Sequence, residues 1–206
     1  MIRYDISPPL SPETAVWPGS RALERQIEKS LDDGDGYDLS NVISTVHIGA
    51  HADAPSHFGP GRDTIGAVDP NRYLGPCRVV RAEVGRRGLI GPEHLPPSID
   101  VSRLLFRTDT FPDTDHFTED FAAFAPDLVD AAADAGVELM GIDTPSVDPF
   151  DSTEVPTHHR MLARDVVGLE GLDLRAVPPG RYQLVALPLR LVGFDASPVR
   201  AVLLDP

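Results

Sequence analysis

Cysteine is almost absent from this sequence of 206 residues. The single Cys77 excludes a disulfide within the chain, and its surroundings, GPCRVVRAEV, are typical of the start of a buried strand rather than of a catalytic thiol. We therefore predict a structural role for Cys77. Long hydrophobic runs are also missing. No apolar stretch approaches the roughly 18–20 residues that span a bilayer, and the first residues lack the basic-then-apolar pattern of a signal peptide. These absences predict a cytoplasmic protein.

Basic residues are scarce as well. The chain has 18 Lys and Arg against 32 Asp and Glu, which gives a formal net charge of -14. Such a charge repels the phosphates of nucleic acids and anionic membrane surfaces, so we expect neither as a partner. The sequence has no glycine-rich phosphate loop and no G-x-S-x-G motif, which argues against nucleotide chemistry and against a serine α/β-hydrolase.

The remaining composition is that of an ordinary globular protein, with 41% hydrophobic and 24% charged residues, and we predict one domain over residues 1–206. Scattered prolines and glycines bound six apolar runs that predict strands, at residues 41–48, 77–84, 103–108, 137–143, 181–189 and 200–206. A helix is predicted in the stretch 125–139, where Gly136 terminates it ahead of the strand, and shorter helices are predicted at residues 69–75 and from Pro92. The pattern favours an α/β fold with a mixed sheet or small barrel and flanking helices.

Histidines are concentrated in HIGAHADAPSHF, residues 47–58, which holds three of the seven histidines in the chain. Alternate side chains of a strand share one face, so a strand through this stretch would present His47, Gly49, His51 and Asp53 together. Glycine between the two imidazoles would leave room for a bound ion. The spacing therefore predicts a metal site.

A further histidine lies just beyond this face. Pro55 is expected to turn the chain and bring His57 back over the site. A single histidine is usually a surface residue, or a core residue that bonds a backbone carbonyl. Three histidines and an aspartate among small residues are different, because such a cluster without a metal repels itself once protonated. We therefore favour metal binding.

Two downstream features complement this cluster. Glu170 lies in the apolar stretch VVGLEGLDL, where a lone carboxylate is expected to be partly buried and to need a cationic partner. With Asp53 and Glu170 as bridging carboxylates, a second ion can be held by one histidine of the pair His158 and His159. Imidazole and carboxylate ligands without a thiolate favour Zn²⁺ first and Mn²⁺ next.

The stretch HIGAHADAPSH resembles the H-x-G-[TA]-H-x-D-x-P-x-H signature of the cyclase-type metal-dependent hydrolases. Further segments are similar to the bacterial kynurenine formamidase (arylformamidase) branch of that family, and they follow the expected order along nearly the whole chain: VWPG at 16–19, GIDTPSVDP at 141–149, HH at 158–159, LEGLDL at 169–174 and ALPLRLVGFDASPVRAVL at the C-terminal end. The chain departs from many family members in two modest ways: Ala50 stands where they have Thr, and Pro156 comes just before the histidine pair. They remove no ligand but leave room for a changed substrate preference.

The resemblance implies a swivelling β/β/α-type fold, a homo-oligomer built on a dimer, and two zinc ions. It implies that the first ion is bound by His47, His51, Asp53 and Glu170, and the second by Asp53, His158 and Glu170. It also implies His57 as the catalytic acid/base and Trp17 as an aromatic contact of the substrate; a core or interface tryptophan is the alternative for Trp17. The choice of His158 over His159 rests on its spacing of twelve residues from Glu170.

The activity implied is hydrolysis of N-formyl-L-kynurenine to L-kynurenine and formate, a step of tryptophan degradation. Metal-bound hydroxide would attack the formyl carbon while His57 moves a proton to the leaving nitrogen. Two alternatives stay open: a related hydrolase that acts on a cyclic amide, as isatin hydrolase does, and a non-catalytic protein whose ions only stabilise the fold. Asp148 is expected to hold a loop, and Asp143 to hold a loop or support the ligands.

Overall fold

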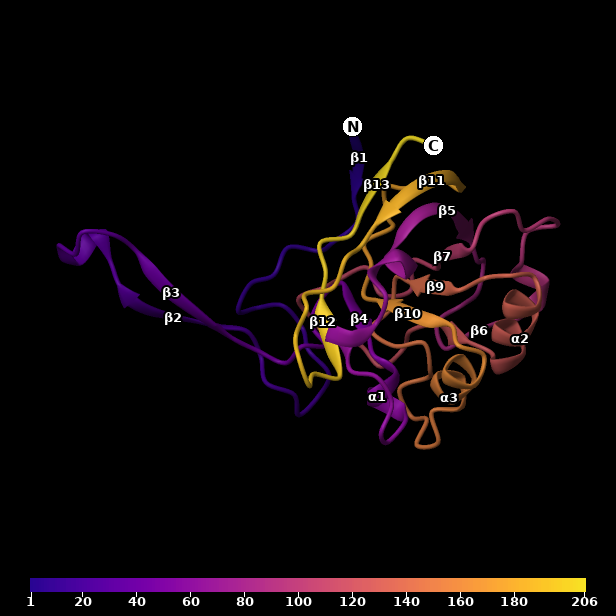
Figure 1. Cartoon of the computed structure of the whole chain (residues 1–206), viewed down its shortest axis with the longest axis horizontal. Helices are drawn as coiled ribbons and strands as arrows, with labels where there is room; N and C mark the ends of the chain where they lie inside the picture. Colours follow the sequence, from indigo (N-terminus) through magenta and orange to yellow (C-terminus); the bar gives the residue numbers. More distant parts are fainter.

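Four parallel strands form the centre of the sheet in the computed structural model, which describes residues 1–206 (Figure 1). They are β5 (Leu74–Arg81), β7 (Arg103–Arg107), β9 (Leu139–Ile142) and β10 (Val167–Glu170). Strands β7 and β9 are buried almost throughout, as is typical of parallel strands covered on both faces. This burial explains why β7 and β9 coincide with predicted apolar runs, whereas β5, which is only partly buried, overlaps its predicted run at residues 77–81.

Antiparallel strands extend the sheet on both sides. The order of the nine strands is β1-β13-β11-β5-β7-β9-β10-β4-β12. The added strands are β1 (Ile2–Asp5), β13 (Val202–Leu204), β11 (Gly180–Val185), β4 (His51–Asp53) and β12 (Ala196–Pro198). Because β1 pairs with β13, the two chain termini lie close together (Figure 1). The predicted α/β fold with a mixed sheet is confirmed.

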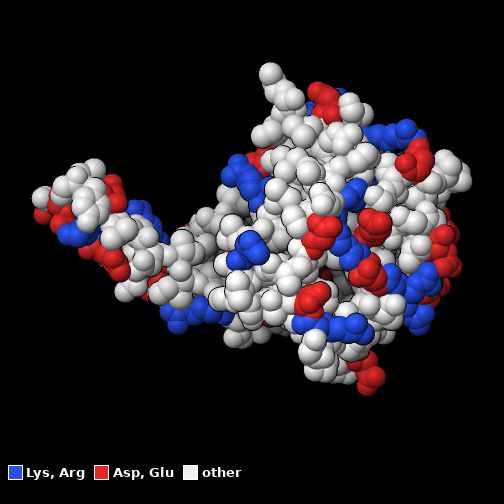
Figure 2. All heavy atoms as spheres, in the orientation of Figure 1, with Lys and Arg blue, Asp and Glu red and all other residues white.

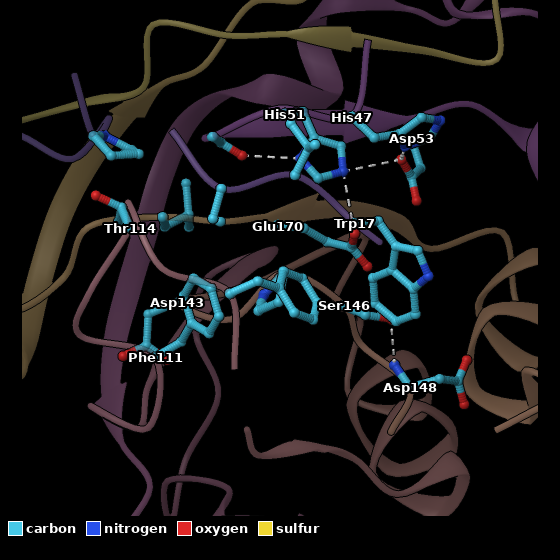
Figure 3. Close-up of a pocket in the computed structure, with 18 of the residues that line it drawn as sticks. Trp17, His47, His51, Asp53, Phe111, Thr114, Asp143, Ser146, Asp148 and Glu170 are labelled. Atoms are coloured by element: carbon cyan, nitrogen blue, oxygen red, sulfur yellow. Dashed lines mark hydrogen bonds and ion pairs between the residues drawn. The ribbon is translucent and has the colours of Figure 1, made fainter. Parts of the chain in front are cut away.

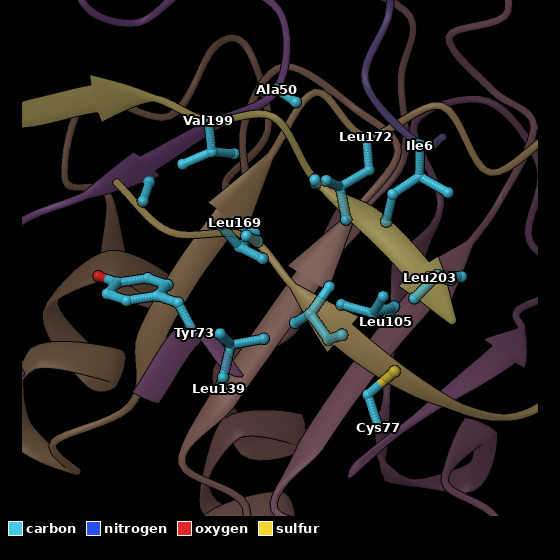
Figure 4. Packing of buried hydrophobic residues seen from close by; sticks show 14 of the residues in the cluster. Ile6, Ala50, Tyr73, Cys77, Leu105, Leu139, Leu169, Leu172, Val199 and Leu203 are labelled. Carbon is cyan, nitrogen blue, oxygen red and sulfur yellow. The ribbon is translucent and has the colours of Figure 1, made fainter. Parts of the chain in front are cut away.

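Two hydrophobic cores lie on opposite faces of this sheet. One contains 21 buried residues, among them Leu105, Leu139, Leu169 and Leu203 (Figure 4). Cys77 belongs to it and is fully buried, which raises the pKa of its thiol to about 12 and agrees with a structural role. The other core contains 14 buried residues and is covered by helices α2 (Pro126–Asp134) and α3 (Pro156–Ala163). A short parallel pair, β6 (Leu89–Ile90) and β8 (Ala123–Phe124), lies beside it.

One predicted helix is confirmed, and two others are shorter than expected. Helix α2 ends at Asp134, just before Gly136 with its φ of 87°, which is where Gly136 was predicted to terminate it. The two other predicted helices are single 3-10 turns, η3 (Pro70–Tyr73) and η4 (Pro92–His94). Similar turns are η1 (Leu31–Asp33) and η2 (Ile65–Ala67). Helices α3 and α1 (Pro55–Phe58) were not predicted.

The predicted strand through residues 41–48 and onward to Asp53 is wrong. Strand β3 ends at Ile43 and β4 begins at His51. Between them, Gly49 has a φ of 54°, a left-handed conformation that breaks an extended strand. A Cβ atom on Gly49 would lie 2.5 Å from Cδ2 of Leu10. Gly49 therefore makes room for a leucine and not, as expected, for an ion.

A two-stranded arm projects from the body (Figure 1). It consists of β2 (Glu24–Lys29) and β3 (Leu39–Ile43), which pair in antiparallel register. Ile27 and Val42 lie on one face of the arm and are 57% and 74% exposed, whereas Gln26 and Asn41 lie on the other face. Acidic and basic groups are interspersed over the body in the view of Figure 2. No helix is both long enough and apolar enough to cross a membrane.

The turn after β10 brings two backbone segments into close contact. Gly171 has a φ of 64°, and a Cβ atom there would collide with the carbonyl group of Gly49. We predict that Gly171→Ala lowers the free energy of unfolding by about 3–5 kcal/mol, because backbone strain and a backbone collision add. Gly136→Ala is the matched control, since Gly136 is also left-handed but has open space around it. It should cost only about 1–2 kcal/mol. If denaturant titrations show equal losses of unfolding free energy in the two variants, the contact with Gly49 does not contribute to the cost.

Candidate active site

A pocket of about 340 Å³ opens at the carboxyl ends of the parallel strands. Asp109, Asp143 and Glu170 stand at or just beyond the ends of β7, β9 and β10, and all three line this pocket. In open α/β sheets this edge is where ligands commonly bind. The fold therefore places Glu170, one of the predicted metal-binding residues, at a favourable position in the sheet.

The centre of the site is set by the pairing of β4 with β10. In this antiparallel register Glu170 lies opposite His51, and Asp53 follows two residues along β4, on the same face. The Nε2 atom of His51 lies 3.2 Å from Oε2 of Glu170 and 3.5 Å from Oδ1 of Asp53 (Figure 3). The other ring nitrogen, Nδ1, lies 3.0 Å from the carbonyl oxygen of Gly49, which fixes the ring orientation.

His47 reaches the same point from the loop before β4. Its Nδ1 atom lies 3.0 Å from Oδ1 of Asp53, and its Nε2 atom lies 3.0 Å from Oδ2 of Asp195. Ligand atoms of His47, His51 and Asp53 lie within 4.8 Å of one another. The predicted convergence of these side chains is therefore present, although a bent loop and not a continuous strand produces it.

Helix α3 contributes His158 to the cluster. Asp148 accepts hydrogen bonds from the backbone N–H groups of Thr157 and His158 at the helix N-terminus, at 2.9 and 3.0 Å. Its Oδ2 atom also lies 2.6 Å from Nδ1 of His158. The Nε2 atom of His158 then faces Oε1 of Glu170 at 3.1 Å and Oδ2 of Asp53 at 3.6 Å. Asp148 therefore does more than hold a loop: it orients an imidazole.

The neighbouring histidine points elsewhere. His159 is exposed, and its ring centroid lies 6.2 Å from that of Phe58. The structure thus brings His158, and not His159, to Glu170, as the spacing predicted.

Asp143 supports the wall of the pocket, since its carboxylate accepts hydrogen bonds from the backbone N–H of Asp109 and from the backbone N–H and hydroxyl of Thr108.

The charges in this cluster stabilise one another. Burial raises the pKa of Asp53, but contacts with His158 and His47 outweigh burial and hold that pKa well below its ordinary value. Burial lowers the pKa of His47, but the carboxylates of Asp53 and Asp195 outweigh it and raise the pKa to about 9. Burial likewise opposes a raised pKa of His158, which Asp148, Asp53 and Glu170 nevertheless impose. The two inner carboxylates, Asp53 and Glu170, therefore attract positive charge strongly.

The donor set fits a metal ion. Nε2 of His51 and Oδ1 of Asp53 are buried and form no hydrogen bond, although each lies 3.0–3.5 Å from side-chain atoms of opposite charge. Contacts without hydrogen-bond geometry leave lone pairs on these atoms that a cation can use. Histidine, aspartate and glutamate side chains that can bind a metal form three overlapping groups, composed of His47, His51 and Asp53; of Asp53, His158 and Glu170; and of His47, His57 and Asp195. A divalent cation would satisfy both unpaired atoms.

His57 lies at the edge of this cluster. Pro55 starts the short helix α1, which turns His57 back toward the pocket as predicted. Its ring centroid lies 4.3 Å from that of His47, and its Nδ1 atom lies 3.3 Å from Oδ2 of Asp195. Burial lowers the pKa of His57. Sequence reasoning did not identify Asp195, whose only signal was its place in the C-terminal segment of the family resemblance.

Trp17 lines the same pocket within a group of aromatic rings. Its ring centroid lies 5.0 Å from that of Phe150, 5.6 Å from that of Phe117 and 6.3 Å from that of Phe121. Phe111, labelled in Figure 3, also lines the pocket, and its ring centroid lies 5.8 Å from that of Phe117. Sequence reasoning missed these phenylalanines because they are scattered along the chain and form no motif.

Known proteins resemble this chain along nearly its whole length. The sequence model of the Cyclase family matches residues 4–149. Proteins named kynurenine formamidase from Bordetella avium and Bordetella pertussis are 45% and 44% identical to the chain, over 97% of its length and 96% of theirs. These two matches continue past residue 149 and cover most of the C-terminal part of the chain, which the family model does not match.

Solved structures share the fold. A predicted metal-dependent hydrolase from Bacillus stearothermophilus superposes with a TM-score of 0.81 at 30% identity, covering 97% of this chain and 96% of that chain. Isatin hydrolase A from Ralstonia solanacearum has the same TM-score of 0.81 at 21% identity, covering 98% of this chain and 91% of that chain, and this likeness concerns the fold alone. From the family model, the sequence identities and the shared fold, we conclude that the chain belongs to the Cyclase family.

Proposed function

We propose that this protein hydrolyses N-formyl-L-kynurenine to L-kynurenine and formate. The observation that carries the proposal is that one pocket is lined by three kinds of group. They are a cluster of side chains that can bind a metal, the imidazole of His57, and the aromatic side chains of Trp17, Phe111 and Phe117. The kynurenine formamidases of Bordetella, at 44–45% identity, support the choice of substrate. The likeness to isatin hydrolase supports only the fold and does not favour a cyclic amide.

Two Zn²⁺ ions are proposed as the metal, with Mn²⁺ as the second choice, because the donors are imidazoles and carboxylates without a thiolate. His47, His51, Asp53 and Glu170 would hold one ion, and Asp53, His158 and Glu170 the other. When bound, such ions supply a nucleophilic water at neutral pH and withdraw electrons from a carbonyl oxygen. Asp148, which contacts Nδ1 of His158, fixes the ring so that Nε2 faces Glu170 and Asp53, the side chains with which it would share an ion.

His57 is proposed to move the proton that amide hydrolysis requires. An anilide anion is a poor leaving group, so the nitrogen must receive a proton as its bond to the formyl carbon breaks. Asp195 lies 3.3 Å from Nδ1 of His57, which leaves Nε2 to accept a proton from water and return it to the leaving nitrogen. Burial keeps the pKa of His57 below its ordinary value and so favours the neutral imidazole that can accept this proton.

Trp17 is proposed to contact the benzene ring of the substrate. An indole in a group of phenylalanines offers a flat apolar surface, against which an aromatic ring packs in a stacked or edge-on geometry. The pocket volume of about 340 Å³ is in the range of small-molecule sites. The core or interface role considered for Trp17 is less well supported, because its side chain lines the pocket of the metal-binding cluster.

A homodimer is proposed as the assembly, and the arm supports it. A two-stranded ribbon is marginally stable by itself in water. One face of the arm exposes two apolar side chains, Ile27 and Val42, beside Arg25 and Ser40, and we call it the apolar face. A second copy of the chain would cover this face. The cytoplasmic location stays a prediction from the sequence.

Metal dependence tests the proposed reaction directly. We expect the Zn²⁺-loaded protein to release formate from N-formyl-L-kynurenine, chelation to abolish release, and added Zn²⁺ or Mn²⁺ to restore it. Formate is assayed together with kynurenine absorbance, and isatin serves as the comparison substrate because opening its ring releases no formate. Ring opening of isatin without formate release from N-formyl-L-kynurenine would refute the formamidase assignment. Metal binding without any turnover would favour the non-catalytic alternative.

Replacing His57 separates proton transfer from metal binding. We predict that His57→Ala lowers kcat by about 10²–10⁴-fold with unchanged metal content, because it removes an acid/base group. His159→Ala is the matched control, since His159 is exposed and lies outside the cluster. It should retain both activity and metal. Loss of metal from His57→Ala, measured by elemental analysis, would instead make His57 a ligand.

The assembly is tested on the two faces of the arm. The double variant Ile27→Glu and Val42→Glu should shift the protein from dimer to monomer in sedimentation velocity, since charges on the apolar face oppose its burial. The control adds charge to the opposite face with Gln26→Glu and Asn41→Asp and should remain dimeric. A monomeric wild type, or a double variant that stays dimeric, would count against the arm as the interface.

A further inference from the structure

One wall of the pocket carries charges that the proposed chemistry does not use. Arg175 is the only lysine or arginine among the 30 residues that line the pocket. Its Nε and Nη2 atoms donate to the carboxylate of Asp173 at 2.9 and 2.7 Å, and its Nη1 atom donates to the carbonyl oxygen of Pro112 at 2.9 Å. A guanidinium group has five N–H donors. Two therefore remain, one on each Nη atom.

The neighbouring carboxylate of Asp109 is already paired. It accepts from Nε and Nη2 of Arg107 at 2.8 and 3.1 Å and also pairs with Arg81. The carboxylate of Asp143, which lines the pocket too, accepts from the backbone N–H of Asp109. The three guanidinium groups of this region are thus matched by three carboxylates. Only Arg175 brings a guanidinium group into the lining, and its two free N–H groups can bind an anionic group of a ligand.

The wall is tied to the metal-binding cluster through the backbone. Arg175 follows Glu170 by five residues, and within this segment the N–H of Asp173 donates to the carbonyl oxygen of Ile6 at 2.8 Å. The side chain of Arg175 is 52% exposed, and that of Asp173 is 23% exposed. An exposed ion pair of this kind contributes little to the stability of the fold. Both Arg175 and Asp173 line the pocket, so their polar atoms are accessible to a ligand.

We propose that Arg175 and Asp173 bind the amino-acid group of the substrate. Arg175 would donate its two free N–H groups to the α-carboxylate, and Asp173 would accept a hydrogen bond from the α-ammonium group. The positive Arg175 and the negative Asp173 would thus match the two opposite charges of the amino-acid group. This proposal rests on the proposed function and extends it, because it assigns selectivity for formamides that carry an amino acid.

The test compares two substrates in metal-loaded protein. N-formyl-L-kynurenine carries the amino-acid group, and N-formyl-2-aminoacetophenone keeps the formanilide and the ketone but lacks that group. In Arg175→Gln, the ratio of kcat/KM for the first substrate to that for the second should fall by about 10–100-fold, mainly through KM for N-formyl-L-kynurenine. Arg175→Lys should recover part of the ratio, because a charge without the planar fork remains.

Arg200→Gln is the matched control. Arg200 is an exposed arginine that pairs with Asp5, outside the pocket. Its replacement should leave the substrate ratio unchanged. An equal loss on both substrates in Arg175→Gln would assign the residue a structural role, and an unchanged ratio would remove it from substrate binding; either result overturns the subsite while the proposed function stands. If wild-type protein turns over neither substrate, the proposed function fails and the subsite with it.

Discussion

The pairing of β4 with β10 is the interaction on which the rest of the site depends. It sets Glu170 opposite His51 and, through the two-residue period of β4, brings Asp53 onto the same face. Two carboxylates are thereby buried side by side, at 9% and 4% exposure. Like charges in such a place are unfavourable unless cations compensate them. The arrangement of the surrounding residues follows from this requirement.

Compensation comes from segments that lie far apart in the sequence. His47 arrives on the loop that Gly49 bends, and His158 on a helix whose N-terminus is bound by Asp148. In the absence of a metal, protons on the imidazoles can supply the positive charge, as the raised pKa of His47 shows. A metal ion competes with these protons for the same lone pairs, so metal binding and the stability of this region are coupled.

The sequence predicted the buried strands well and the local geometry less well. Strands β7 and β9 are covered on both faces, so they form continuous apolar runs that are easily recognised. Helix α3 was missed because its polar pair, His158 and His159, and Pro156 at its start resemble a loop. The convergence of the cluster was predicted for a partly wrong reason: its members do lie together, but Gly49 breaks the strand that was expected to align them. Asp195 belongs to no local pattern, because only tertiary contacts join it to His47 and His57.

Substrate preference in this fold is separable from metal chemistry. The two positions where the chain departs from the family pattern lie outside the pocket, since Ala50 is buried in the first hydrophobic core and Pro156 starts α3. Neither substitution therefore changes the shape of the pocket directly. Two parts of its lining, the aromatic side chains around Trp17 and the segment after β10, contain none of the proposed ligands. Changes there can alter which amide is bound while the pairing of β4 with β10 continues to hold the metal-binding side chains in place.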